Sequence, residues 1–98
     1  MTLDEAKKVI REVIHHAAEG GFYPEERRRV DAALASLRSH ARSYEHEHIR
    51  ELEGLISTLE SPQKLRRYSG GGSQVRAWIV GCLDKVGWDR DTNETGNA

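Results

Sequence analysis

The stretch from Glu25 to Ser61 contains no proline and only one glycine, Gly54, and this lack of helix breakers constrains the fold more than any other feature. Proline and glycine are the residues that most often interrupt a helix. One continuous helix over residues 25–60 would be ~54 Å long at ~1.5 Å per residue. A chain of this length has a radius of gyration of only ~13 Å when compact, so such a helix would protrude and need a partner chain.

The apolar pattern within this stretch offers one place for a break. Two helical stripes are recognisable, and they consist of Val30, Ala33, Leu34, Leu37, Ala41 and Tyr44, and then of Ile49, Leu52, Ile56 and Leu59. The step from Tyr44 to Ile49 is longer than the spacing of three or four residues that keeps a helix face apolar. Ser43 can cap a new helix, with Glu45 and Glu47 in its first turn. We therefore predict a break near residues 43–46, with one long helix as the alternative.

The N-terminal residues predict a helix over residues 2–19. Thr2 and Glu5 have the spacing of a capping box, in which each side chain binds the backbone N–H of the other residue. The apolar face recurs every three or four positions and consists of Leu3, Ala6, Ile10, Val13, Ile14 and Ala17. Gly20 and Gly21 end this helix. Pro24 keeps Tyr23 out of the helical region, and a second helix begins near Glu25.

The C-terminal third predicts a short helix and then a longer one. Ser61 and Pro62 fit an N-cap and a first helical position, which begins a helix over residues 62–68. Ser73 is expected to cap the last helix, and Gly87 to end it. The apolar face of this last helix consists of Val75, Trp78, Ile79, Cys82, Leu83 and Val86. Residues 89–98 have no apolar side chain except a final alanine and are expected to form a flexible C-terminal tail.

Length and composition limit the architecture to one small domain. The chain has 98 residues, of which 37% are apolar, and no segment alternates apolar and polar residues as a strand does. We predict an all-α fold, a bundle of about four helices over residues 1–88 with a glycine-rich loop before the last helix. No apolar run approaches the ~20 residues that span a bilayer, so we expect a cytoplasmic protein without a membrane partner. The single cysteine excludes an internal disulfide framework.

The glycine-rich loop, with the sequence RRYSGGGSQVRAW, is the strongest candidate for a binding site. Residues 61–76 carry four basic side chains and no acidic one. Backbone N–H groups at a helix start, together with nearby arginines, can bind an anion. The candidate residues are Lys64, Arg66, Arg67, Ser69, Gly70, Gly71, Gly72, Ser73 and Arg76. The loop matches neither phosphate-binding glycine motif, so a flexible linker is the alternative interpretation.

The histidines do not predict a metal centre. Glu12 with His15, and Glu45 with His48, have the Glu-x-x-His spacing found in di-iron helical bundles. Glu12, however, projects ~140° away from the apolar face of its helix and is expected to point to water. Glu45 and His48 lie near the apolar side of their helix, so one of them is expected to be a polar group within an interface. We predict neither a metal ion nor a cofactor.

Two further features argue against nucleic-acid binding by the whole chain and against catalysis. Glu25 and Glu26 offset much of the arginine run that follows them, and the net charge is −1, whereas nucleic-acid domains carry a basic excess. Cys82 lies on an apolar face, with no base placed beside it by the sequence, as nucleophilic catalysis would require. We therefore do not expect an enzyme.

The apolar residues belong to the helix stripes, and the remaining residues form no pattern typical of a catalytic or metal site. We predict a non-enzymatic protein–protein interaction module, a small regulator, adaptor or inhibitor that acts through a helical surface. The wide stripe from Val30 to Leu59 favours self-association as a homodimer. The interface candidates are Phe22, Tyr23, Tyr44, His48 and Trp88. The alternative function is binding of a nucleotide or a nucleic-acid backbone at residues 64–76.

Overall fold

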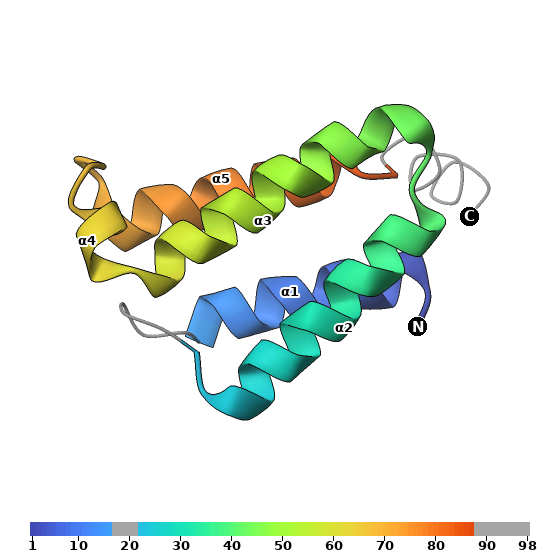
Figure 1. The fold of residues 1–98 in the computed structure, drawn as a ribbon, viewed down its shortest axis with the longest axis horizontal. Helices are drawn as coiled ribbons and strands as arrows, with labels where there is room; N and C mark the ends of the chain where they lie inside the picture. The colour runs from blue at the N-terminus through green and yellow to red at the C-terminus, as the bar shows by residue number, and fades with distance from the viewer. Residues whose placement is uncertain (17–21, 88–98) are drawn as a thin grey trace.

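The chain folds into two helical hairpins packed against each other. The computed structural model describes residues 1–16 and 22–87. Within these ranges the elements are α1 (Leu3–His16), α2 (Pro24–His40), the 3₁₀ helix η1 (Ser43–Glu45), α3 (His46–Glu60), α4 (Pro62–Leu65) and α5 (Gly71–Lys85). Figure 1 shows α1 antiparallel to α2 and α3 antiparallel to α5, with α4 in the turn between α3 and α5. The predicted all-α bundle is confirmed, while residues 89–98 and the glycine pair at 20–21 lie outside the described residues.

The helix starts follow the local signals in the sequence. The backbone N–H of Thr2 donates to Glu5 Oε1, and the N–H of Glu5 donates to Thr2 Oγ1, both at 3.2 Å, which is the predicted capping box. Hydrogen bonding of the Glu5 carboxyl to the backbone and the side chain of Thr2 lowers the pKa of this exposed group. Ser61 Oγ accepts the N–H of Lys64 at 3.4 Å and caps α4. That helix ends at Leu65, earlier than predicted, and a turn continues to the glycines.

The stretch from Glu25 to Ser61 is broken, as the spacing of its stripes predicts. Helix α2 ends at His40, and Ala41 and Arg42 are extended, with ψ angles of 144° and 160°. The prediction that Tyr44 belongs to the buried stripe is wrong, because the helical register stops at His40 and the Tyr44 side chain is 55% exposed. The radius of gyration is 13.5 Å, close to the ~13 Å expected for a compact chain of this length.

The core is a continuous apolar layer between the four long helices. Its fully buried side chains include Ile10, Val30, Leu37, Ile49, Leu52, Ile56, Leu59, Val75, Ile79 and Leu83. The stripes between Val30 and Leu59, which favoured a homodimer, are therefore buried within one chain. Self-association stays a prediction, and among the described residues it would have to use a surface other than these buried side chains.

The first and last helices, α1 and α5, each supply a cation to the end of the other. Lys7 Nζ donates to the backbone oxygen of Val86 at 2.9 Å, just past the end of α5. Arg76 Nε donates to the backbone oxygen of Ile14 at 3.0 Å, in the last turn of α1. Backbone oxygens at a helix C-terminus lack intrahelical donors and carry partial negative charge, so a cation there is stabilising. The antiparallel arrangement of α1 and α5 makes this exchange possible.

A buried carboxylate closes the end of the bundle near η1. Glu45 is completely buried, and its Oε1 accepts the N–H of Arg42 at 2.9 Å while its Oε2 accepts the N–H of Gly87. Gly87 has a φ angle of +73°, the left-handed conformation that ends many helices, so its predicted role is confirmed. Glu45 is thus the polar group that the sequence placed within an interface, and that interface is internal.

Two helical glycines have room for a side chain, and replacing them should stabilise the fold. A Cβ atom built on Gly54 or on Gly81 meets no other atom within 4 Å. We expect Gly54→Ala and Gly81→Ala each to raise the free energy of unfolding by ~0.5–1 kcal/mol, because alanine loses less backbone entropy in a helix. Denaturant unfolding measures the change.

The control for this prediction is Gly71→Ala, because Gly71 has a φ angle of +59° that alanine adopts only with strain. This variant should lower the free energy of unfolding. A loss of stability in Gly54→Ala or Gly81→Ala would contradict the prediction.

None of the helices in the described ranges is long and apolar enough to cross a membrane.

Candidate functional site

The glycine-rich segment spans the turn before α5 and the first residues of that helix, since Ser69 and Gly70 lie in the turn and Gly71 and Gly72 in the helix. Helix α5 begins at Gly71, so the prediction that Ser73 caps it is wrong. The N–H of Gly70 donates to Gln74 Oε1 at 3.0 Å, and the N–H of Gly71 donates to the backbone oxygen of Tyr68 at 3.0 Å. The side chain of Gln74, in the first turn of the helix, is thus the one that accepts a backbone N–H at the start of α5, as was expected of Ser73. Two of the backbone donors that an anion would use are therefore already bonded.

The structure separates the basic residues of the predicted anion site. Lys64 Nζ donates to Ser57 Oγ of α3 at 3.1 Å, and Arg76 is turned toward α1. Arg66 and Arg67 are exposed, and their side chains form no hydrogen bond or ion pair with the described parts of the chain. A hollow of about 500 Å³ lies beside Arg66 and is lined by Pro62, Leu65, Arg66, Tyr68, Ser69, Gly70, Gly71 and Gly72. Arg67 is the next residue in the chain and is not part of this lining. The anion site stays a prediction that now depends mainly on the two arginines.

Trp78 lies on the surface, although its place in the apolar pattern predicted a buried side chain. It is 45% exposed, and its ring stands edge-on to that of Tyr68, with centroids 5.3 Å apart and an interplanar angle of 79°. The reason is its position on the helix. Trp78 projects ~80° from the centre of the buried face of α5 at ~100° per residue, and that flank is not covered by another helix.

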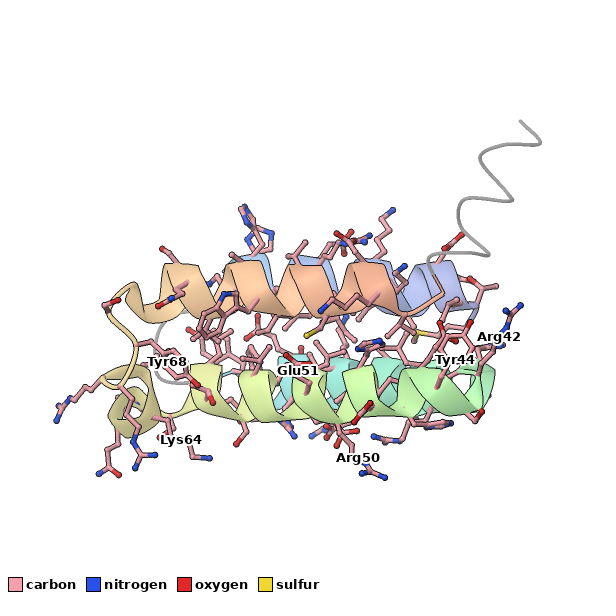
Figure 2. All side chains as sticks on the ribbon, turned by 90° about the horizontal axis from the view of Figure 1, so that it is seen from above. Arg42, Tyr44, Arg50, Glu51, Lys64 and Tyr68 are labelled. Atoms are coloured by element: carbon pink, nitrogen blue, oxygen red, sulfur yellow. The ribbon has the colours of Figure 1, made fainter. Side chains whose placement is uncertain are left out.

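A second hollow lies next to Trp78, along the boundary between α3 and α5. It has a volume of about 350 Å³ and is lined by Glu51, Ala77, Trp78, Gly81, Cys82 and Lys85; we call it the Trp78 hollow. Figure 2 shows Glu51 midway along the bundle, between the ribbons of α3 and α5. Ala77 and Gly81 have little or no side chain and leave space beside the indole ring. Trp78 was not predicted as a site residue, although Ala77 and Gly81, two small residues one helical turn apart beside this tryptophan, were a signal for a hollow.

A third hollow, of about 410 Å³, lies where α1 ends beside α5, and its lining includes Arg11, Glu12, His15, Arg76 and Val80. Its charged groups are engaged. Arg11 pairs with Asp84 at 2.8 Å, Glu12 lies 3.7 Å from Arg29, and Arg76 binds α1. This hollow therefore presents mainly apolar surface and no charged group available to a ligand.

The five predicted interface residues do not form one surface. Tyr23 is 78% exposed at the start of α2, while Tyr44 is exposed beyond the other end of that helix, which is ~25 Å long at ~1.5 Å per residue. Phe22 is half-buried against the core, and His48 is half-buried on α3. Trp88 lies outside the described residues.

The two Glu-x-x-His pairs serve different purposes in the fold. Glu12 is exposed and points to water, as predicted, while Glu45 is buried and bound to backbone N–H groups. Within residues 1–16 and 22–87, no three histidine, cysteine, aspartate or glutamate side chains gather where they could hold a metal ion.

Cys82 is a buried thiol with a raised pKa. Burial raises the pKa most, and the negative charge of Glu51 and the hydrogen bond with that carboxylate raise it further. The thiol is only 3% exposed. A thiol in these surroundings stays protonated at neutral pH and is a poor nucleophile.

We expect iodoacetamide to modify Cys82 much more slowly in the folded chain than in denaturant at neutral pH. Glu51→Gln should lower the thiol pKa and shift the rise in rate to lower pH. Because the folded pKa lies above the unfolded value, this thiol's contribution to stability is present below the unfolded pKa of ~8.5 and is lost as pH rises through the folded pKa. Equal rates in the folded and unfolded chain would contradict the prediction.

These features define a small all-α bundle of two hairpins, in which the exposed Trp78 and the half-buried Tyr68 each line a different surface hollow. Comparisons with protein-family models, with curated proteins and with solved structures give no match for this chain. The function must therefore be inferred from the physical chemistry of the surface.

Proposed function

We propose that the chain is a non-enzymatic protein-binding module that docks a partner protein on the outer face of α5. The observation that carries this proposal is the 45% exposure of Trp78 at the rim of the Trp78 hollow. Tryptophan is the residue type most enriched among interface hot spots, and it contributes most when a pocket lies beside it. Exposing an indole costs solvation free energy that docking recovers.

The remaining surface supports binding rather than catalysis. Burial and the neighbouring Glu51 carboxylate raise the pKa of the Cys82 thiol, so the single cysteine of the chain is protonated and not activated as a nucleophile. A binding module of this size acts as a small regulator, adaptor or inhibitor, and a free buried cysteine agrees with the cytoplasm as its location. A second copy of the chain is one partner to test, and it would have to use the α5 surface because the Val30–Leu59 stripe is buried.

The test is photo-crosslinking from Gly81, within the Trp78 hollow, in cells that naturally contain the protein. A benzophenone amino acid at position 81 should give a discrete adduct, and the same group at Gly54 should not. Both glycines are exposed and have room for a side chain, so they form a matched pair. An adduct of twice the chain's mass would identify a homodimer.

We expect Trp78→Ala to weaken binding of the crosslinked partner by about 30-fold, which corresponds to ~2 kcal/mol. Isothermal titration calorimetry with the purified partner measures the change, and Tyr44→Ala, at the far end of the bundle from α4, is the control. Equal adducts from positions 81 and 54, or unchanged affinity in Trp78→Ala, would refute the proposed surface.

Binding of a nucleotide or a nucleic-acid backbone is the second candidate function. The observation that favours it is the pair of exposed arginines, Arg66 and Arg67, which form no ion pair with the described residues and of which Arg66 lines a hollow. Fewer groups are left for an anion than the sequence suggested. The N–H groups of Gly70 and Gly71 are already hydrogen-bonded, and the Arg76 side chain binds the backbone oxygen of Ile14 in α1.

A further inference from the structure

The half-buried Tyr68 and the exposed Trp78 are in contact where two hollows meet, and we call this aromatic pair the ridge. Tyr68 lines the hollow beside Arg66, and Trp78 lines the Trp78 hollow. Their rings are in edge-to-face contact, so the two hollows belong to one surface that crosses the ridge. In Figure 2 Tyr68 lies at the α4 end of the molecule and Glu51 midway along it, which gives the direction of this surface along the bundle.

The α4 end of this surface carries positive charge that the fold does not neutralise. Four other arginines are paired with acids: Arg11 with Asp84, Arg27 with Asp31 and Glu60, Arg29 with Glu12, and Arg38 with Glu53. Arg28 and Arg50 are exposed without an ion pair to the described residues, but each stands apart from the two hollows. Residues 61–83 contain no acid, and the carboxylate of Glu60 is held by Arg27. Arg66 and Arg67 are therefore left with their charge available to a partner.

The Trp78 hollow has a different character from the α4 end. Its centre is apolar and small, with Ala77 and Gly81 beside the indole, and its two charged groups, Glu51 and Lys85, have opposite signs. A partner that matches the whole surface must carry negative charge at one end only. Its other end must offer an apolar side chain to the ridge and the hollow.

We propose that the partner of this surface is an acidic protein segment that carries carboxylates next to a large apolar side chain. The carboxylates bind the guanidinium groups of Arg66 and Arg67, and the apolar side chain packs against Trp78. This inference rests on the proposed function and names the chemistry of its partner. A nucleic acid fits less well, because its phosphates continue along the strand and would meet the Glu51 carboxylate in the Trp78 hollow.

The test is selection from a phage-displayed library of random peptide segments against the full chain. We expect the wild-type chain to enrich segments that combine an excess of aspartate and glutamate with large apolar residues. The double variant Arg66→Glu, Arg67→Glu should lose that acidic excess and bind the enriched segments about tenfold more weakly. Arg50→Glu is the matched control, because Arg50 is exposed on α3 and points away from α5 in Figure 2.

The other outcomes separate this inference from the proposed function. Enriched segments that are neutral or basic but still require Trp78 would overturn the acidic partner and leave the α5 surface in place. Enrichment that does not depend on Trp78, or no enrichment, would reject both. If oligothymidylate binds as tightly as the enriched segments, and the double variant Arg66→Glu, Arg67→Glu loses this binding, the surface would be assigned to nucleic acid. Circular dichroism of each variant verifies that it is folded.

Discussion

Replacing Glu45 by alanine is expected to lower the free energy of unfolding by about 3 kcal/mol. The carboxylate is completely buried and accepts the N–H groups of Arg42, in the connection between α2 and α3, and of Gly87, after the end of α5. Its removal leaves two N–H groups without that acceptor, and hydrogen bonds to a charged group contribute ~1.5–3 kcal/mol each. Urea unfolding followed by circular dichroism measures the loss.

Glu47→Ala is the control for this prediction. Glu47 is exposed in the first turn of α3, two positions further along, and its replacement should change stability by less than ~0.5 kcal/mol. Glu45→Gln should fall between the two, because the amide keeps one acceptor oxygen. Equal stability of Glu45→Ala and Glu47→Ala would show that the buried carboxylate does not hold the end of the bundle.

Lys7→Met should interact with Glu45→Ala in a double-mutant cycle. Lys7 holds the backbone oxygen of Val86 and Glu45 holds the N–H of Gly87, so both act on the same two residues after α5. Once one of these bonds is lost, the segment is free to shift and the second bond contributes less. Additive losses would show that the two groups act independently.

Replacing Ile79 by alanine is expected to lower the free energy of unfolding by about 2–5 kcal/mol. Ile79 lies in the middle of α5 and is completely buried in the layer between the hairpins. Truncation removes apolar contacts and leaves a cavity that the neighbouring helices fill only in part. Thermal and urea unfolding both measure this loss of stability. A loss of the expected size would show that α5 is part of the cooperative core.

Val80→Ala is the matched control, because Val80 is the next residue of the same helix and is only half-buried. We expect it to cost less than ~1.5 kcal/mol. If Ile79→Ala costs no more than Val80→Ala, then α5 does not pack on the core as the structure has it.

The parts of the fold that depend on neighbouring residues could be predicted from the sequence. The capping box of Thr2 and Glu5, the cap at Ser61 and the stop at Gly87 are local hydrogen-bond or backbone preferences. The break between α2 and α3 was also indicated locally, because the spacing between the apolar residues Tyr44 and Ile49 is longer than the helical repeat allows. The exact break came earlier because Ala41 and Arg42 are extended, which no breaker residue marks.

The errors came from extending a helical period beyond what tertiary packing allows. Tyr44 continues the apolar spacing of α2, but the helix ends before this residue. Trp78 lies at the edge of the buried face of α5, and only the centre of that face packs against the core. The hydrogen bond from Arg76 to the backbone oxygen of Ile14 joins residues 62 positions apart. The local sequence pattern therefore could not show that Arg76 does not belong to the predicted anion site. Glu45 was recognised as a polar group near an apolar side, but the hydrogen bond that its carboxylate accepts from the N–H of Gly87 depends on the whole topology.

The exchange of cations between α1 and α5 has a consequence for the order in which the molecule assembles. Each hairpin is built from segments that follow one another closely in the chain, whereas the bonds from Lys7 to Val86 and from Arg76 to Ile14 join residues 79 and 62 positions apart. Closing such long loops is entropically costly and slow compared with forming a hairpin. The two hairpins are therefore expected to form first and to dock last, and the chain reaches its native state only when its first and last helices meet.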